Sequence, residues 1–443
     1  MKKVFFIGIG GIGVSALARY YLSQGWEVFG SDLARSEITD DLKKIGARIF
    51  VKKNINLKKT APDLAIYSLA AKNNPELRRV QDMGVKIMSY PQALGELTKK
   101  YRTVAVAGAH GKSTVTAMIG MMLAAAKFDP TVVVGTKVKS FKNTNFRSGK
   151  SDLLVIEACE YDRAFWNYFP DIAVVTNIEM DHIECYENEA NLRAAFEKFA
   201  GNLKPGGKLL VCAEDAGAKK LGESMKKKGI EVLNYSRTIP EAKFFSEILR
   251  VPGEHNVTNA LAALAVGRML EIDDETIFKS LAKYRGSWRR FDRRRGEIFG
   301  KKITVVLDYG HHPTQIKLTM AAARQLWPKK RIICVFQPHQ VWRTSLLFDD
   351  FAKVFRESPL DKTFITDIYR VAGRENEKIS KDINSEKLAD AVGSKKTEYL
   401  AKKQIAVKLK KEINKGDILL VLGAGDIYDY MQKILRNQSC DCA

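Results

Sequence analysis

The residues best suited to chemistry lie in one glycine-containing turn, at 104–114. An apolar run of β type leads into it, and Gly111, Lys112 and Ser113 open a helical pattern. Backbone N–H groups at such a turn bind phosphate, a lysine reaches the β- and γ-phosphates, and a serine hydroxyl can bind Mg²⁺. The full phosphate-loop pattern, G-x-x-x-x-G-K-[ST], has a glycine five residues before its second glycine, and here Val106 occupies that position. Only the shortened pattern G-x-x-G-K-S is present. This turn predicts an ATP site, and the alternative is an ordinary strand-to-helix turn. The residues of the predicted ATP site are Gly108, Ala109, His110, Gly111, Lys112, Ser113 and Thr114.

Two further residues that could bind a ligand lie in or after apolar runs of the same part of the chain. Glu157 lies in the run 153–158, and His182 follows the run 172–178. The carboxyl ends of parallel strands present the ligand groups of an open α/β sheet, and a carboxylate among apolar residues is costly to bury without a partner. We therefore expect Glu157 and His182 to bind a metal ion. The alternatives are a helix-capping or salt-bridged acid for Glu157 and a hydrogen-bonded surface histidine for His182.

A second glycine turn lies near the start of the chain. The pattern Gly8-x-Gly10-x-x-Gly13 joins a strand to a helical pattern, and Asp32 ends the next strand, as the ribose acid does in a dinucleotide fold. The two lysines and the apolar run before the turn superficially suggest a signal peptide, but the glycine spacing favours a first strand. The turn predicts a site for a nucleotide or its diphosphate. The alternative is a Rossmann-like domain with an empty or degenerate site.

The remaining polar candidates lie at a helix start and at four strand ends. His255, Asn256 and Asn259 begin a helical pattern, where they either contact a base or cap the helix. The last third has four apolar runs of β type, at 303–307, 331–336, 363–366 and 418–422. Polar or glycine-rich turns follow them at 308–313, 337–339, 367–369 and 423–426. Four such turns on one sheet edge predict a further part of a binding site.

Length and element order predict the architecture. A chain of 443 residues is too long for one core, and at about 150 residues per domain three are expected. Strands alternate with helices, which predicts α/β domains with mostly parallel sheets flanked by helices. We expect a Rossmann-like domain at 1–99, a central phosphate-loop domain at 100–294 and a second Rossmann-like domain at 295–443. The candidate hinges lie near Tyr101 and Arg295.

Composition limits the functional classes. No apolar run reaches the roughly 18 residues of a membrane span, and the six cysteines, scattered except for Cys440 and Cys442, form no disulfide or zinc pattern. The net charge of +22 is compatible with nucleic-acid binding. The lysines are dispersed, however, and no aromatic-interleaved basic module occurs. We expect a cytoplasmic protein with no membrane insertion and no nucleic-acid partner.

Several long strings occur in the order that is typical of the Mur ligase family. They are FIGIGGIGVSALA, AGAHGKST, EACEYDRAF, NIEMDH, GEHNVTNALAA, WRRF, DYGHHPTQI, FQPHQVWRT, ITDIY and GAGDI. The chain resembles this family, within it the alanine-adding branch, over essentially its whole length. The resemblance implies that the carboxylate of UDP-N-acetylmuramate attacks the γ-phosphate of ATP, and that L-alanine then attacks the acyl phosphate, in peptidoglycan synthesis. It also implies Mg²⁺ (or Mn²⁺) and a monomer or homodimer.

The resemblance also implies residue roles. The implied catalytic residues are Lys112, His182 and Arg290, with Arg289 as the alternative to Arg290. The implied ligands of the ATP-bound metal ion are Ser113 (or Thr114) and Glu157, and His182 is the implied ligand of a second ion. The implied adenine contacts are His255, Asn256 and Asn259, and Asp308 and His311 reach the nucleotide from the third domain. The implied UDP-sugar contacts are Gly10, Gly11, Ile12 and Ser68, and the implied carboxylate contacts are His339 and Arg343.

Four positions distinguish this chain within the resemblance. Leu307 stands where the family usually has a second acid, and Gln340 and Trp342 replace an arginine and a small residue. Phe196 stands where related ligases carry a carbamylated lysine, which favours the alanine branch. Two alternatives stay open: a recycling ligase that attaches a stem tripeptide, and a Mur-like protein that binds nucleotide without turnover.

Overall fold

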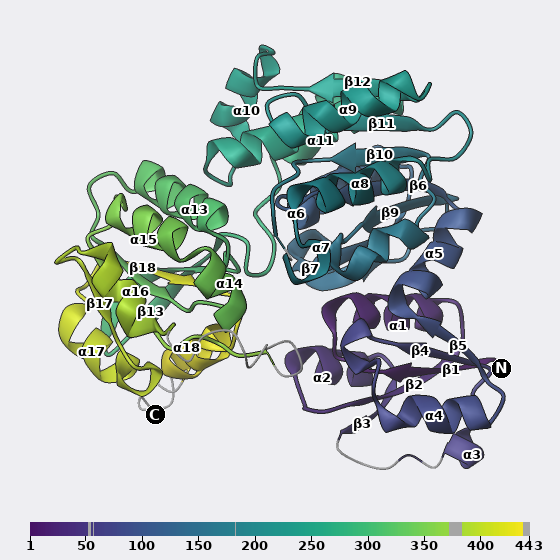
Figure 1. Cartoon of the computed structure of the whole chain (residues 1–443), viewed down its shortest axis with the longest axis horizontal. Helices are drawn as coiled ribbons and strands as arrows, with labels where there is room; N and C mark the ends of the chain where they lie inside the picture. Colours follow the sequence, from purple (N-terminus) through teal and green to yellow (C-terminus); the bar gives the residue numbers. More distant parts are fainter. Residues whose placement is uncertain (52–54, 56, 182, 372–382, 437–443) are drawn as a thin grey trace. The chain divides into compact units, whose positions relative to one another are not determined.

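The computed structural model describes residues 1–51, 55, 57–181, 183–371 and 383–436. The chain divides into two compact units (Figure 1). Unit 1 comprises Met1–Leu249 and Asn256–Arg285, and unit 2 comprises Arg250–His255 and Gly286–Ala443.

Unit 1 begins with a five-stranded parallel sheet of order β3-β2-β1-β4-β5. Its strands are β1 (Lys3–Ile7), β2 (Glu27–Asp32), β3 (Arg48–Val51), β4 (Leu64–Tyr67) and β5 (Lys86–Ser89). Its helices are α1 (Ile12–Ser23), α2 (Glu37–Lys44), α3 (Leu57–Thr60), α4 (Pro75–Asp82) and α5 (Tyr90–Lys100), with a 3₁₀ turn η1 (Leu69–Ala71). The central strand β1 has four fully buried apolar residues, as expected of a parallel strand covered on both faces.

The second sheet of unit 1 has seven strands in the order β12-β11-β10-β6-β9-β7-β8, with β8 antiparallel to β7. They are β6 (Arg102–Ala107), β7 (Thr131–Val138), β8 (Thr144–Arg147), β9 (Leu153–Glu157), β10 (Ile172–Val175), β11 (Lys208–Cys212) and β12 (Glu231–Tyr235). The α-helices are α6 (Lys112–Ala125), α7 (Ile183–Tyr186), α8 (Glu189–Ala200), α9 (Ala216–Lys227), α10 (Glu241–Ile248), α11 (Glu254–Met269) and α12 (Asp274–Leu281). The first two residues of α11, Glu254 and His255, are counted with unit 2. The 3₁₀ turns are η2 (Lys139–Phe141) and η3 (Tyr161–Asn167).

One hydrophobic core joins the two sheets of unit 1. Polar contacts reinforce the junction of α1 and α2 with the β7–β8 hairpin. The Asn145 amide donates to the Ile12 carbonyl and to the Ser15 hydroxyl, and the buried Lys137 ammonium lies 2.7 Å from Glu37 and 2.9 Å from Asp41. The start of α1 is therefore anchored to the second sheet.

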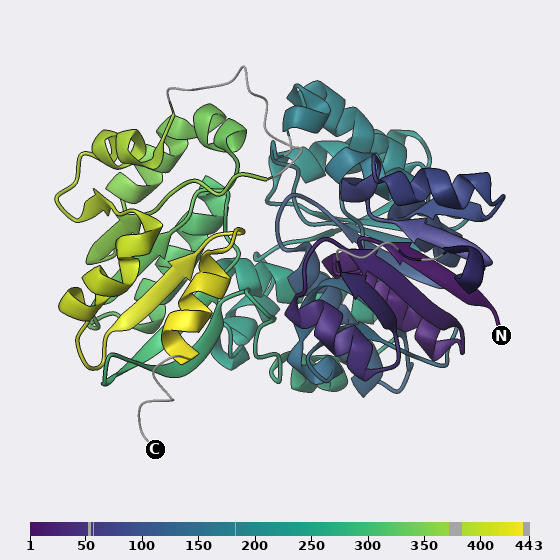
Figure 2. The ribbon, with the colours of Figure 1, turned by 90° about the horizontal axis from the view of Figure 1, so that it is seen from below.

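Unit 2 is built on a six-stranded sheet of order β13-β14-β18-β15-β16-β17, parallel except for β13. Its strands are β13 (Asp292–Ile298), β14 (Lys301–Asp308), β15 (Ile332–Phe336), β16 (Lys362–Ile365), β17 (Thr397–Tyr399) and β18 (Ile418–Leu422). Its helices are α13 (Pro313–Leu326), α14 (Val341–Leu346), α15 (Phe348–Arg356), α16 (Ser385–Val392), α17 (Ile405–Glu412) and α18 (Ile427–Arg436), with a 3₁₀ turn η4 (Lys402–Gln404). In Figure 2 the yellow β18 and α18 lie side by side.

The fold class predicted from the sequence is confirmed: three mostly parallel sheets are flanked by helices. Arg295 itself lies within β13, and the boundary between the two units falls earlier, between Arg285 and Gly286. Tyr101 lies inside unit 1, and its carbonyl accepts hydrogen bonds from Lys204 and Thr103, which argues against a hinge there. The predicted strand 172–178 ends at Val175. Within the described residues, no helix has both the length and the apolar character needed to span a membrane.

Candidate active site

The turn between β6 and α6 has the backbone that the glycine pattern predicts. Gly108 (φ 133°) and Gly111 (φ 84°) both have positive φ, which side-chain-bearing residues rarely adopt. A Cβ at Gly108 would lie 2.1 Å from the Thr176 hydroxyl, and one at Gly111 would lie 2.6 Å from the Asn259 amide oxygen. Both positions require glycine for conformation and for space.

Residues that follow β10 hold this turn in place. The Asn177 carbonyl accepts from the Ala109 N–H at 3.2 Å, and the Asn177 side chain accepts from the His110 N–H at 2.8 Å. The Thr176 hydroxyl donates to the His110 carbonyl at 2.5 Å. The N–H groups of the first helical turn, which have no partner within a helix, are thus held in a fixed orientation. The sequence analysis missed this role of Thr176 and Asn177, although the NIEMDH string begins at Asn177.

Lys112 folds back over the turn. Its ammonium donates to the carbonyls of Gly108 (2.5 Å) and Ala109 (3.2 Å) and lies 2.9 Å from the Glu160 carboxylate. Burial disfavours the charged form, but Glu160, with smaller contributions from Cys159 and Glu157, outweighs burial and raises the pKa of Lys112. Glu160 is the second acid of EACEYDRAF, and the sequence analysis singled out only the first, Glu157.

The oxygen atoms near this turn suit a hard metal ion. The Ser113 hydroxyl is buried and has no hydrogen-bond partner among the described residues, and buried hydroxyls normally have one. Glu157, at the end of β9, accepts a hydrogen bond from the Gly135 N–H at 2.7 Å. Hydroxyl and carboxylate oxygens are the donors that Mg²⁺ prefers. The third predicted ligand, His182, lies outside the described residues, as do Cys440 and Cys442.

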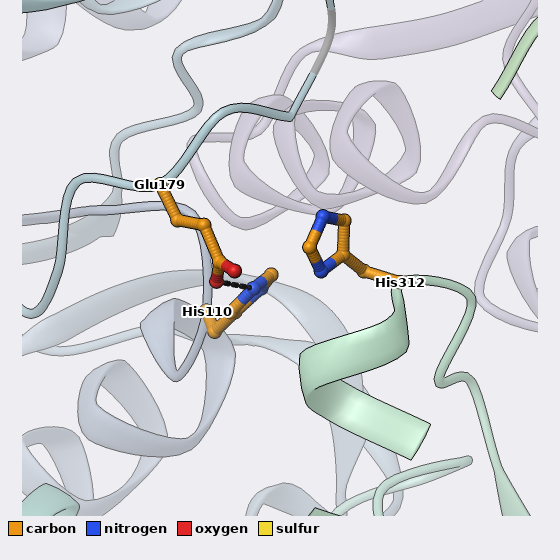
Figure 3. A group of neighbouring side chains, drawn as sticks. All are labelled: His110, Glu179 and His312. Atoms are coloured by element: carbon orange, nitrogen blue, oxygen red, sulfur yellow. Dashed lines mark hydrogen bonds and ion pairs between the residues drawn. The ribbon is translucent and has the colours of Figure 1, made fainter. Parts of the chain in front are cut away.

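His110 has a carboxylate partner in the same unit. Its Nε2 atom lies 2.7 Å from the Glu179 carboxylate, drawn as a dashed line in Figure 3. With its N–H and carbonyl bound as described above, His110 is held at both backbone and side chain. The geometry supports a role in shaping the turn.

The predicted adenine contacts lie in the first turns of α11. The Asn259 amide donates weakly to the Asn256 side chain at 3.4 Å, and both residues are buried. Since Asn259 also lies against Gly111, this pair adjoins the turn between β6 and α6. Burial lowers the pKa of His255 to about 4, so its imidazole is neutral at pH 7.

The first glycine turn is closed by its own acid. Asp32 accepts from the Gly10 N–H at 2.8 Å and from the Ala34 N–H at 3.3 Å, so Gly10 is already hydrogen-bonded. Gly11 is the N-cap of α1, with an extended backbone, and Ile12 is its first residue. Ser68, after β4, lies beside Gly8, where a Cβ would come within 3.0 Å of it. The four predicted UDP-sugar residues therefore gather at the carboxyl ends of β1 and β4.

In unit 2, Asp308 and the two candidate arginines lie together. Asp308 accepts from the N–H groups of Phe291 and Gly310, each at 2.7 Å, and burial raises its pKa despite Arg290 nearby. Arg289 donates to the Gly423 carbonyl at 2.6 Å, and its guanidinium lies over the rings of Trp288, Tyr309 and Tyr428. These contacts give Arg289 a structural role and favour Arg290 as the phosphate-contacting residue.

The turns after β14, β15 and β16 meet at one edge of the third sheet. The rings of His311 and His339 are 5.8 Å apart, and His339 stacks on Tyr369 at 5.6 Å. The Arg343 guanidinium lies 3.2 Å from the His339 Nδ1 atom. The turn after β18 joins them, since a Cβ at Gly425 would lie 2.5 Å from the Tyr369 ring. The predicted gathering of four turns is confirmed.

The structure shows the surroundings of the four positions at which this chain differs from the family pattern. Leu307 is buried in β14 and Phe196 packs edge-on against Phe165, so both places are apolar core. Gln340 has φ 69° and ψ 129°, an unusual conformation for a non-glycine residue. The Trp342 indole N–H is buried, with no hydrogen-bond acceptor among the described residues. Irregular features thus gather beside His339 and Arg343.

Comparisons with known proteins cover almost the whole chain. Three family models match it: "Mur ligase family, catalytic domain" at residues 3–102, "Mur ligase middle domain" at 106–250 and "Mur ligase, glutamate ligase domain" at 289–425. A UDP-N-acetylmuramate--L-alanine ligase of Salinibacter ruber is 37% identical over 97% of this chain and 93% of its own length. The chain belongs to the Mur ligase family. One of Clostridium tetani is also 37% identical, over 97% of this chain and 96% of its own.

Solved structures agree with this membership. The UDP-N-acetylmuramate-alanine ligase of Thermotoga maritima matches this Mur ligase with a TM-score of 0.80 and 27% identity, over 99% of this chain and 100% of that one. A murein peptide ligase of Psychrobacter arcticus shares the fold, with a TM-score of 0.73 and 21% identity over the full length of both chains. As a member of an ATP-dependent family, the chain uses ATP as a co-substrate.

Proposed function

We propose that this Mur ligase joins L-alanine to the lactyl carboxylate of UDP-N-acetylmuramate, with conversion of ATP to ADP and phosphate, in peptidoglycan synthesis. The observation that carries the proposal is the near full-length similarity to ligases of that name. The phosphate turn adds the matching chemistry, because Lys112 and the buried Ser113 hydroxyl lie where a strand leads into a helix.

The proposed division of labour assigns one ligand to each glycine turn. The turn of Gly10, Gly11 and Ile12, with Ser68, holds the UDP-sugar. The turn at 108–114 holds the phosphates of ATP, and the start of α11 contacts its adenine. In unit 2, Asp308 and His311 serve the nucleotide, and His339 and Arg343 hold a carboxylate. Three domains, at 1–99, 100–294 and 295–443, follow this division.

The proposed reaction has two bond-forming steps. The lactyl carboxylate oxygen attacks the γ-phosphorus of ATP, and the bond to the β-phosphate oxygen breaks, giving ADP and an acyl phosphate. The amine of L-alanine then attacks the acyl carbon, and the tetrahedral intermediate loses a proton from nitrogen and expels phosphate. Two anions must approach each other in the first step, and Lys112 and Arg290 offset their repulsion.

A divalent metal ion, Mg²⁺ or Mn²⁺, fits the residues around the turn. Ser113 and Glu157 would hold the ATP-bound ion and His182 a second ion, and the buried Ser113 hydroxyl is the observation that supports the first assignment. When bound, such an ion supplies charge neutralisation at the transferred phosphoryl group. We further propose a cytoplasmic enzyme, either monomeric or homodimeric, that needs neither nucleic acid nor membrane.

The test is phosphate release from ATP with Mg²⁺ and UDP-N-acetylmuramate, across L-alanine, glycine, L-serine and the stem tripeptide. The proposal predicts release with L-alanine, and the product mass equals the sugar nucleotide plus one alanine residue. Release of phosphate with the tripeptide alone would mean that the chain is the recycling ligase instead. No release with any acceptor, together with intact nucleotide binding, would mean a binding protein without turnover.

A further inference from the structure

The Lys112–Glu160 contact is unusual because both charged groups are largely buried. Their side chains are 12% and 2% exposed, and the ammonium lies 3.1 Å from Oε1 and 2.9 Å from Oε2 of the carboxylate. A buried ion pair in contact with both carboxylate oxygens is costly to break, because each charge is then left without a partner. The lysine assigned to the phosphates therefore already has a strong counter-ion.

The turn that carries Glu160 is held in a strained conformation. Asp162 and Arg163 both have positive φ, 49° and 55°, which costs energy in non-glycine residues and persists where the surroundings enforce it. The Glu160 carbonyl accepts from the Tyr186 hydroxyl and from the Arg163 N–H. The Arg163 guanidinium lies 5.5 Å from the centroid of the Tyr186 ring. These contacts fix Glu160 in front of Lys112.

Nucleotide phosphates and Glu160 are anions that need the same cation. Lys112 extends toward phosphates only by weakening its contact with Glu160, and the fixed carboxylate then lies near the phosphate charge. In a low-dielectric site this repulsion is large. Both effects lower nucleotide affinity.

We propose that Glu160 is a positioning residue that competes with the nucleotide phosphates for the Lys112 ammonium and thereby weakens nucleotide binding. This inference rests on the proposed function only in taking Lys112 as the nucleotide lysine. Competition makes a prediction of opposite sign to that of a merely structural role: removing the negative charge tightens binding.

The experiment measures the dissociation constants of ADP, with Mg²⁺, and of UDP-N-acetylmuramate for the full chain and for Glu160→Gln. We expect Glu160→Gln to bind ADP at least about threefold more tightly, a difference of about 0.7 kcal/mol, with unchanged UDP-sugar binding. ADP should also raise the thermal unfolding midpoint of the variant by more than that of the wild type. Weaker or unchanged ADP binding by a folded variant would overturn the inference.

A matched control variant distinguishes the effect of the Lys112–Glu160 ion pair on ADP affinity from the effect of net charge. Asp162→Asn removes one negative charge from the same turn, at an exposed position whose positive φ asparagine tolerates, and we expect ADP affinity to stay within about twofold. An equal tightening in Asp162→Asn would mean that net charge, not competition for Lys112, sets the affinity.

A second variant covers the case in which Glu160→Gln does not fold. Glu160→Asp keeps the charge but shortens the side chain by one methylene, which weakens the contact with Lys112. A smaller tightening of ADP binding is expected, and weaker or unchanged binding would overturn the inference. Failure of the wild type to bind ADP would count against the proposed function instead, so the two failures are distinguishable.

Discussion

The two glycine turns of unit 1 both lead from a parallel strand into a helix, yet they differ in how their polar groups are occupied. In the first turn, Asp32 accepts from Gly10 and thus supplies a negative charge, and the turn itself has no basic residue. In the second turn, backbone groups are fixed by Asn177, while Lys112 supplies a positive charge and Ser113 a buried hydroxyl.

The difference indicates that two glycine turns in the same strand-to-helix setting suit different ligands. A turn closed by its own acid can hold a diphosphate at a helix start, but it offers no cation to a transferred phosphoryl group. The second turn offers that cation, with backbone geometry fixed before the ligand binds. Variants in each turn should therefore affect different ligands.

The largest effect is expected from Lys112→Ala. It removes the cation of the second turn, so kcat for phosphate release should fall by about 10³-fold or more. UDP-N-acetylmuramate binding, measured by titration, should stay nearly unchanged. Lys220→Ala, an exposed lysine on α9, is the control. Equal loss of turnover and UDP-sugar binding would contradict the separation of the two turns.

Gly108→Ala should have the next largest effect. Its Cβ would lie 2.1 Å from the Thr176 hydroxyl at a φ of 133°, so the turn must shift, and a displacement of about 1 Å can cost roughly 10² in kcat/KM. The measurement is kcat/KM for ATP. Gly206→Ala also places an alanine at a positive φ, 76°, but with nothing within 4 Å, and should retain full activity. Similar losses in both variants would point to general destabilisation.

Gly10→Ala should have a smaller effect, and on the other ligand. Its Cβ would lie 2.9 Å from the Asp32 carboxylate and 3.0 Å from Thr39, both side-chain atoms, and its φ is not positive. We expect the KM for UDP-N-acetylmuramate to rise about tenfold, equivalent to about 1.4 kcal/mol, with the KM for ATP unchanged. A rise in the KM for ATP alone would contradict the assignment of the UDP-sugar to the first turn.

The last prediction leaves ligand binding unchanged and concerns the pH dependence of stability at the start of α11. His255 has a folded pKa of about 4, against an ordinary 6.5, so the unfolded chain binds the proton more readily. Its contribution to stability is complete above pH 6.5 and is lost as pH falls toward 4, by about 2 kcal/mol between pH 7 and pH 5. Chemical denaturation at both pH values should show this loss in the wild type and less of it in His255→Gln. The same loss in both proteins would exclude His255 as its source.

Much of this architecture was predictable because parallel strands leave strong apolar runs. The fold class, the strand-turn-helix conformation at 104–114 and the four turns of the third sheet were predicted correctly. Strands without such a run were not predicted, among them the edge strand β13. The arginine-rich β13 illustrates the reason, because it contains no apolar run: exposed residues alternate with partly buried ones, and only its two end residues, Asp292 and Ile298, are buried.

The candidate site was less predictable where it depends on contacts between distant residues. Nothing in the spacing of Glu160 or Asn177 indicates that one pairs with Lys112 and the other holds the turn. Both contacts arise because β9, β6 and β10 are neighbours in the sheet. Asp32 was predicted as a ribose acid, and its bond to Gly10 likewise required the folded chain.

The most direct test of the two-turn account is hydrogen–deuterium exchange of the full chain with each ligand alone. We predict that ADP with Mg²⁺ slows exchange at residues 108–114 and leaves 8–13 unchanged, whereas UDP-N-acetylmuramate does the reverse. Protection of the same turn by both ligands, or protection of 108–114 by the UDP-sugar alone, would contradict the account.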